Sequence, residues 1–123
     1  MSGSPLSDLQ VLILEDEPLV SMMTEDMVVD LGGTVVGPFS RLDALVRHIE
    51  AGGGCDLALL DVNVNGERST TVADLLRARD IPIIFCTGYD DAGIGEAWRS
   101  APRLRKPFSD AELEQAMRSA LGR

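Results

Sequence analysis

Short apolar runs alternate with helical patterns along most of the chain. Five runs are predicted to be strands, at Val11–Leu14, Thr34–Val36, Leu57–Leu60, Ile81–Phe85 and Arg103–Arg105. Between these runs, apolar residues recur every three or four positions, as they do on one face of a helix. Such alternation is typical of βα units, in which helices connect parallel strands. The pattern therefore predicts an α/β fold with a doubly wound, five-stranded parallel sheet and five helices.

Proline, glycine and capping residues between the runs predict where the first helices begin and end. Pro18 suits the first position of a helix, whose apolar residues follow at a spacing of four, at Leu19, Met23, Met27 and Leu31. Gly32 and Gly33 are expected to end it. The second helix is expected to begin at Ser40, with Asp43 three residues later as an acidic variant of the capping box. Its apolar face comprises Leu42, Leu45, Val46 and Ile49.

The later helices differ in the strength of their signals. Ser69 to Thr71 are interpreted as the capped start of the third helix, which carries Val72, Leu75 and Leu76. Ser109 and Glu112 form a full S-x-x-E capping box for the last helix. The segment Asp90–Ser100 has two glycines and few large apolar residues, so we expect it to be the least ordered helix-length segment.

Composition and charge narrow the class of protein. A chain of 123 residues with 45% apolar residues fits one globular domain. Twenty acidic and 11 basic residues give a net charge of −9, which argues against nucleic acid and anionic membranes as partners. The chain shows no signal peptide and no apolar run long enough to span a bilayer, and its cysteines, Cys55 and Cys86, are too few for a disulfide framework. We therefore expect a cytoplasmic location.

Acidic residues follow two of the predicted strands. Glu15 and Asp16 come directly after the first strand, and Asp61 follows the third. Because the carboxyl ends of parallel strands meet at one edge of the sheet, we expect these three carboxylates to converge. Three like charges repel each other unless a cation neutralises them. Oxygen ligands without Cys or His favour a hard ion, so Mg²⁺ is the first expectation and Ca²⁺ the second.

A hydroxyl and an ammonium group complete the pattern. Thr87 closes the fourth strand in FCTGY, and Lys106 follows the fifth in RLRKPF. A phosphoryl-accepting site requires acids, a nucleophilic carboxylate, a hydroxyl and a cationic group, and all of these are expected at this edge of the sheet. His48, by contrast, lies on the polar side of its helix and is interpreted as a solvated residue.

These motifs resemble those of response-regulator receiver domains, and the resemblance runs from Leu9 to Leu121, with residues 1–8 as an N-terminal tail. It implies a flavodoxin-like strand order, 2-1-3-4-5. It also implies that Asp61 is the phospho-acceptor, and that Mg²⁺ is bound by Asp61 together with Glu15, Asp16 and the backbone carbonyl of Asn63.

The resemblance assigns roles to the last two strand ends as well. Thr87 matches the hydroxyl that contacts the phosphoryl group, and Lys106 matches the lysine that pairs with it, followed by a cis bond to Pro107. The sequence FCTGY, with the short VNVNGE stretch after Asp61, is similar to the TGY-type ("FAT GUY") receivers of alphaproteobacteria. Arg103 stands where ordinary receivers carry an aromatic residue, so the usual Thr–aromatic switch is not expected.

The function predicted from this resemblance is a signalling domain rather than an enzyme. Its partners would be a sensor histidine kinase, a downstream protein or phosphotransfer partner, and a second copy in a weak homodimer. Three alternatives remain: an aspartate-nucleophile phosphatase, which needs an Asp where Asn63 stands; a flavin mononucleotide carrier, which needs a phosphate loop where EDE stands; and a phosphate-independent pseudo-receiver.

Overall fold

The structure, a computed structural model, describes residues 6–88, 98 and 101–122. In chain order its elements are β1 (Gln10–Leu14), α1 (Pro18–Asp30), β2 (Thr34–Phe39), α2 (Leu42–Glu50), β3 (Leu57–Asp61), β4 (Asn63–Val64), β5 (Glu67–Arg68), α3 (Thr70–Arg77), β6 (Ile83–Thr87), β7 (Arg103–Arg105) and α4 (Asp110–Leu121). None of the helices among the described residues is long and apolar enough to cross a membrane.

Five parallel strands form the sheet in the order β2-β1-β3-β6-β7. This confirms the predicted strand order, because β6 and β7 are the fourth and fifth strands of the sheet. Two short strands, β4 and β5, form a separate antiparallel hairpin that was not predicted. The described residues contain four helices, not five, because the segment 90–100 that we expected to carry the fifth lies outside them except for Trp98.

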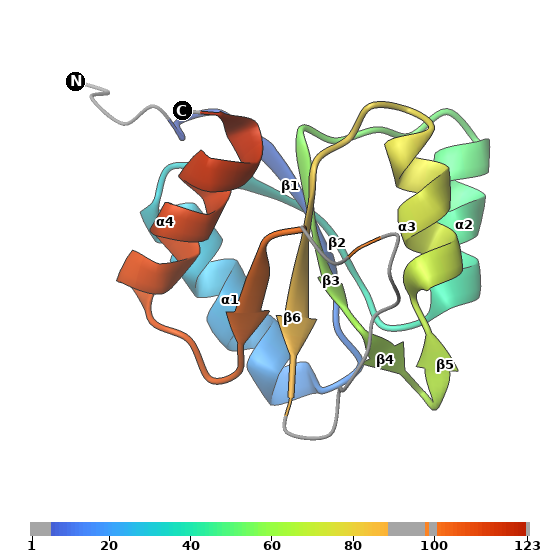
Figure 1. Ribbon diagram of the computed structural model, residues 1–123, viewed down its shortest axis with the longest axis horizontal. Coiled ribbons are helices and arrows are strands. Elements are labelled where there is room, and N and C mark those ends of the chain that lie inside the picture. Colours follow the sequence, from blue (N-terminus) through green and yellow to red (C-terminus); the bar gives the residue numbers. More distant parts are fainter. Residues whose placement is uncertain (1–5, 89–97, 99–100, 123) are drawn as a thin grey trace.

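Helices cover both faces of the sheet (Figure 1), with α1 and α4 on one face and α2 and α3 on the other. Each face has its own apolar core, and the central strand β3 is buried along its whole length, as a strand covered on both sides should be. Leu6 is fully buried in the core beneath α1 and α4. Leu6 thus belongs to the packed domain, although it lies in the stretch that was expected to be a tail.

The apolar row predicted for α1 does not coincide with its buried face. Leu19 and Met23 are 70% and 49% exposed, whereas the face toward the sheet consists of the buried residues Ser21, Thr24 and Val28. An α-helix has 3.6 residues per turn, so residues four apart in the sequence lie about 40° apart around its axis. The row therefore starts in solvent at Leu19 and becomes half-buried only toward its end.

Several predicted boundaries were wrong. Strand β6 runs from Ile83 to Thr87, two residues later at each end than predicted. Strand β2 continues to Phe39 because Gly37 and Pro38 form an irregularity within an edge strand, where proline is tolerated, and pairing resumes beyond it. The N-cap position of α2 is Arg41 rather than Ser40, and no side-chain cap bond is made there. The predicted capping box is therefore absent, and the Asp43 carboxylate accepts instead from the Arg41 side chain and from the backbone N–H of Ala44. The capping box of α4 is confirmed, since its two reciprocal hydrogen bonds measure 2.9 and 3.1 Å.

Candidate functional site

Three carboxylates meet at the carboxyl edge of the sheet. Asp61 is the last residue of β3, and Glu15 and Asp16 directly follow β1, the neighbouring strand. One oxygen from each of the three lies within 4.8 Å of the others. Glu15 and Asp61 are buried, whereas Asp16 is half-buried. The parallel pairing of β1 and β3 thus brings together acids that are 45 residues apart in the chain.

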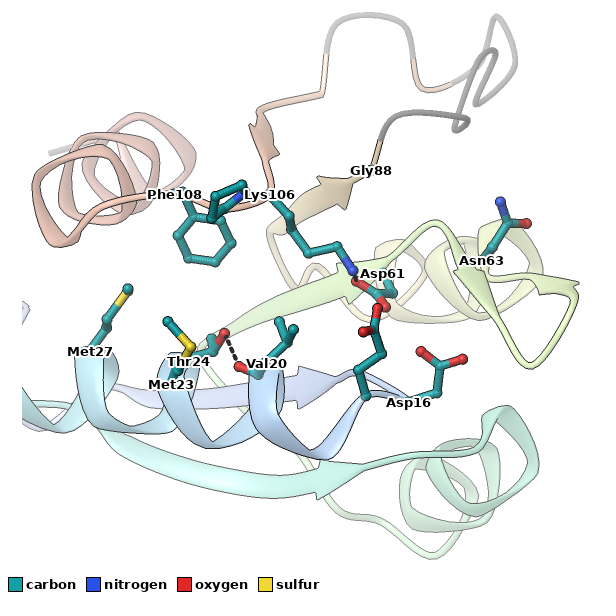
Figure 2. Close-up of a pocket in the computed structure, with 12 residues that line it drawn as sticks. Asp16, Val20, Met23, Thr24, Met27, Asp61, Asn63, Gly88, Lys106 and Phe108 are labelled. Atoms are coloured by element: carbon teal, nitrogen blue, oxygen red, sulfur yellow. Dashed lines mark hydrogen bonds and ion pairs between the residues drawn. The ribbon is translucent and has the colours of Figure 1, made fainter.

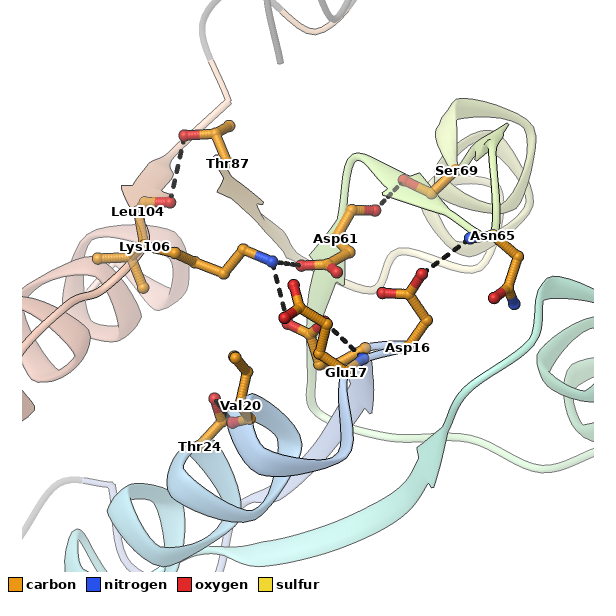
Figure 3. Close-up of polar contacts among 11 residues, drawn as sticks. Asp16, Glu17, Val20, Thr24, Asp61, Asn65, Ser69, Thr87, Leu104 and Lys106 are labelled. Carbon is orange, nitrogen blue, oxygen red and sulfur yellow. Dashed lines mark hydrogen bonds and ion pairs between the residues drawn. The ribbon is translucent and has the colours of Figure 1, made fainter. Parts of the chain in front are cut away.

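Lys106 supplies the positive charge of this cluster. Its Nζ donates to Asp61 Oδ1 at 2.9 Å (Figure 3). The same Nζ donates to Glu15 Oε1 at 3.2 Å. The acid side chains are 4% and 5% exposed and that of the lysine is 18% exposed, so the ion pairs lie in a largely desolvated place. The lysine reaches them because β7 ends beside β6, and the cis bond expected between Lys106 and Pro107 is present.

The electrostatics of the cluster reflect this crowding. Burial raises the pKa of the Asp61 carboxyl and Glu15 raises it further, and together they outweigh the opposing effect of Lys106. Burial lowers the pKa of Lys106, but its hydrogen bonds and charge interactions with Asp61 and Glu15 raise the net pKa above the ordinary value. One ammonium group therefore does not balance the negative charge that the protein gathers at this edge.

The donor set fits a hard divalent cation. The cluster offers three carboxylates and no sulfur or imidazole ligand, which is the donor chemistry that Mg²⁺ and Ca²⁺ prefer. Asn63 begins β4 two residues after Asp61, and its half-buried side chain points away from the acids (Figure 2). A role for Asn63 at the cluster would thus use its backbone carbonyl rather than its amide.

Thr87 lies at the sheet edge but is not in contact with the acids. It is the last residue of β6, and its Oγ1 donates to the carbonyl of Leu104 in β7 at 3.4 Å (Figure 3). Contact between this hydroxyl and a group on Asp61 would require the side chain to rotate away from Leu104. The structure therefore brings together four of the sequence-predicted side chains, those of Glu15, Asp16, Asp61 and Lys106.

Ser69 contacts the phospho-acceptor candidate in a way that the sequence analysis missed. Its hydroxyl is fully buried and donates to the backbone carbonyl of Asp61, and its N–H donates to Val62 O at 2.9 Å. Ser69 is the N-cap residue of α3, as predicted, but its side chain makes no cap bond because the hydroxyl is engaged with Asp61. The contact spans eight residues of chain, and the Asn-Gly turn between Asp61 and Ser69 is the signal that could have revealed it.

A cavity of about 580 Å³ opens beside the acids (Figure 2). Its polar end is formed by Asp16, Asp61 and Lys106, and its apolar wall by Val20, Met23, Met27 and Phe108. The apolar wall comes from α1 and from the turn before α4, so an approaching group would meet these two segments.

Arg103 occupies the position that ordinary receivers give to an aromatic residue. Its side chain is exposed, and Nη2 donates to the carbonyl of Trp98 at 3.4 Å. Trp98 is buried, and its ring packs edge-on against Phe85 with the ring centroids 5.4 Å apart. Its Nε1–H donates to the Asp74 carboxylate on α3. The arginine thus holds the backbone of a buried tryptophan rather than filling a slot beside Thr87.

Comparisons with known proteins agree with this geometry. The family described as "Response regulator receiver domain" matches residues 11–118. The solution structure of SdrG from Sphingomonas melonis Fr1 is similar, with 42% identity, a TM-score of 0.84 and full coverage of both chains. The BeF3-activated conformation of SdrG from Pseudomonas melonis Fr1 has 40% identity and a TM-score of 0.78, over 98% of this chain and 99% of that one.

A curated relative extends the comparison. The phyllosphere-induced regulator PhyR of Methylorubrum extorquens is 32% identical over 115 residues, covering 91% of this chain. The match covers 43% of PhyR, so the chain spans less than half of that protein's length. The resemblance drawn from the sequence motifs is confirmed at the level of the family, and the chain belongs to the response regulator receiver domains.

Proposed function

We propose that this receiver domain accepts a phosphoryl group on Asp61 from a phosphohistidine of a sensor histidine kinase. The observation that carries the proposal is the arrangement at the sheet edge, where two buried carboxylates share one ammonium group and a third carboxylate lies close by. A structural ion pair needs one acid and one base, whereas this cluster has an excess of acids. Such an excess suits a site that binds a cation and a charged phosphoryl group together.

In the proposed step an Asp61 carboxylate oxygen attacks phosphorus. The new O–P bond forms as the P–N bond to the donor histidine breaks, and the electron pair stays on the imidazole, which then takes up a proton. Lys106, already 2.9 Å from Asp61, neutralises charge on the transferring group. Thr87 donates its hydroxyl to a phosphoryl oxygen after leaving the Leu104 carbonyl. Hydrolysis of the aspartyl phosphate resets the domain.

Mg²⁺ is the proposed cofactor. Glu15, Asp16, Asp61 and the backbone carbonyl of Asn63 would hold it, and when bound it would neutralise charge on the phosphoryl oxygens. The support for this assignment is the all-oxygen donor set and the close approach of the three carboxylates.

The donor partner would approach over the cavity beside Asp61. The cavity has an apolar wall of methionine and phenylalanine side chains, and the same cavity is lined by the acids Asp16 and Asp61. A phosphohistidine carried on a protein with an apolar surface matches that opening. We further propose membership of the TGY-type subfamily, on the FCTGY sequence and the arginine at position 103, with output through a protein partner or a second copy.

Intact mass spectrometry after incubation with Mg²⁺ and a small acyl phosphate tests this proposal. The wild type should gain the mass of one phosphoryl group, and Asp61→Asn should gain none. Asp56→Asn is the matched control, because Asp56 is an exposed acid whose carboxylate accepts from Gln10 N, away from the acid cluster. No gain with the wild type, or an equal gain with Asp61→Asn, would overturn the proposal and favour a phosphate-independent docking module.

A further inference from the structure

The β4–β5 hairpin directly follows Asp61 and folds around a tight turn. Asn65 and Gly66 form its tip with φ values of +52° and +82°, so both lie in the left-handed region. Two consecutive residues of this kind define the type I′ turn, for which Asn-Gly is the preferred pair. The strands pair Asn63 with Arg68 and Val64 with Glu67. The sequence itself thus selects a defined hairpin rather than an open loop.

The base of the hairpin is fixed to the core and to Asp61. Val62 and Val64 are fully buried among the apolar residues beneath α2 and α3. Ser69 closes the base, because its N–H donates to the carbonyl of Val62 and its hydroxyl to that of Asp61. The position of the tip is consequently tied to the position of the acceptor residue.

The tip of the hairpin holds a carboxylate of the acid cluster. The backbone N–H of Asn65 donates to Asp16 Oδ2 at 2.9 Å (Figure 3). The side-chain amide of the same residue donates to the carbonyl of Ser40, which follows β2, at 3.0 Å. Asn65 therefore contacts the loops after β1 and β2 at once, although it is 49 and 25 residues from its partners.

We infer that Asn65 is a positioning residue that keeps the Asp16 carboxylate in place for a divalent cation. The inference rests on the Mg²⁺ site of the proposed function and adds to it a residue that is itself no ligand. Asn65 acts through Asp16. The hydrogen bond from the Asn65 side chain to the Ser40 carbonyl keeps the Asn65 backbone N–H directed at the Asp16 carboxylate.

Asp16 needs such a partner more than the other two acids do. Glu15 and Asp61 are buried and bonded to Lys106, whereas Asp16 is half-buried and its neighbours are like charges. Repulsion would turn a half-buried aspartate toward solvent, since water solvates a lone carboxylate well. A hydrogen bond from a backbone N–H to a charged acceptor opposes that rotation. This bond engages Oδ2 and leaves Oδ1 available to a cation.

Two variants separate the side-chain bond from the backbone geometry. Asn65→Gly keeps the N–H and tolerates the positive φ but deletes the amide that contacts Ser40, whereas Asn65→Ala also strains the turn. We expect Mg²⁺ alone, titrated by calorimetry, to bind about threefold more weakly to the glycine variant and about tenfold more weakly to the alanine variant, the range that loosening one charge-assisted hydrogen bond covers. Glu67→Asp, an exposed hairpin change that keeps the charge, should bind Mg²⁺ as the wild type does.

A purely structural role for Asn65 predicts a different pattern. It would lower the melting temperature in EDTA and leave the Mg²⁺ dissociation constant unchanged, and this result would overturn the inference. Tighter binding in either variant would also overturn it, since the hairpin would then compete with the metal. If the wild type binds Mg²⁺ and accepts a phosphoryl group while the variants bind the metal equally well, the positioning role alone is wrong. If the wild type binds no Mg²⁺, both the proposed metal site and the positioning role of Asn65 are wrong.

Discussion

Replacing Lys106 by methionine tests the electrostatic account of the acid cluster. Methionine has a similar length and no charge, so Glu15 and Asp61 lose their shared cation while the space stays filled. The two acid side chains are only 5% and 4% exposed and cannot turn to bulk water in place. Lys106→Met should therefore destabilise the metal-free protein by leaving buried carboxylates unpaired.

The size of the loss follows from burial. Removing one partner of a buried ion pair costs about 3–5 kcal/mol. Because the lysine side chain is itself 18% exposed and the cavity admits water, we expect the lower end of that range, about 3 kcal/mol. For a domain of this size, that loss lowers the melting temperature by about 10 °C. The exposed neighbour on β7 gives a matched control, and Arg105→Met should change stability by less than about 0.5 kcal/mol.

The loss should depend on pH and on Mg²⁺. The pKa of the Asp61 carboxyl is already raised to about 8, mainly by burial, and without the lysine it rises further above its value in the unfolded chain. The folded state then binds more protons than the unfolded state, so its stability falls as pH rises. The difference between wild type and Lys106→Met in urea titrations with EDTA should accordingly be larger at pH 8 than at pH 5. Mg²⁺ should stabilise the variant more than the wild type, because it replaces the missing charge. Equal stability of the two proteins at pH 8 would refute this reasoning.

Other predictions concern the metal, the acceptor carbonyl, the thiols and the tryptophan. A tenfold excess of Mg²⁺ over its dissociation constant should stabilise the wild type by about 1.4 kcal/mol in thermal melts and leave Asp16→Asn almost unaffected; an equal response would contradict the assigned site. Ser69→Ala removes the hydroxyl that donates to the Asp61 backbone carbonyl, and it should lower the free energy of unfolding in urea by about 1–3 kcal/mol. A loss below about 0.5 kcal/mol would mean that this hydrogen bond contributes little. Burial raises the pKa of the Cys55 thiol to about 11 and raises that of the Cys86 thiol further. Ellman's reagent at pH 8 should therefore react far more slowly with the folded protein than with a free thiol, and the reaction should become faster as pH rises. A reaction at the free-thiol rate would count against this burial. Beryllofluoride with Mg²⁺ should change the emission of Trp98, the single tryptophan, if the signal passes from β6 to the residue that Arg103 holds; an unchanged spectrum would exclude that route.

Local signals in the sequence predicted the parts of the fold that depend on neighbouring residues. The capping box of α4 was correct because both of its hydrogen bonds join residues three apart. The convergence of Glu15, Asp16 and Asp61 followed from a rule about parallel sheets that needs only the strand ends. Lys106 was placed by the same rule, since β7 ends at this edge.

The sequence could not predict features that depend on tertiary packing. The buried face of α1 consists of Ser21, Thr24 and Val28, whereas Leu19 and Met23 face solvent. The apolar spacing of Leu19 and Met23 is the same whether they face solvent or core, so the sequence could not distinguish the two. The contacts of Ser69 with Asp61 and of Asn65 with Asp16 arise only when the hairpin has folded back on the strand ends. The predicted disorder of 90–100 lies outside the described residues, apart from Trp98.

The most direct measurement of the central claim is the location of the phosphoryl group. The protein would be incubated with an acyl phosphate at increasing Mg²⁺, treated with borohydride, which reduces an aspartyl phosphate to homoserine, digested and sequenced by tandem mass spectrometry. Homoserine should replace Asp61 alone, in a fraction that rises with Mg²⁺ and vanishes in EDTA. Modification of Glu15 or Asp16 instead, or a yield at Asp61 that is unchanged in EDTA, would contradict the account.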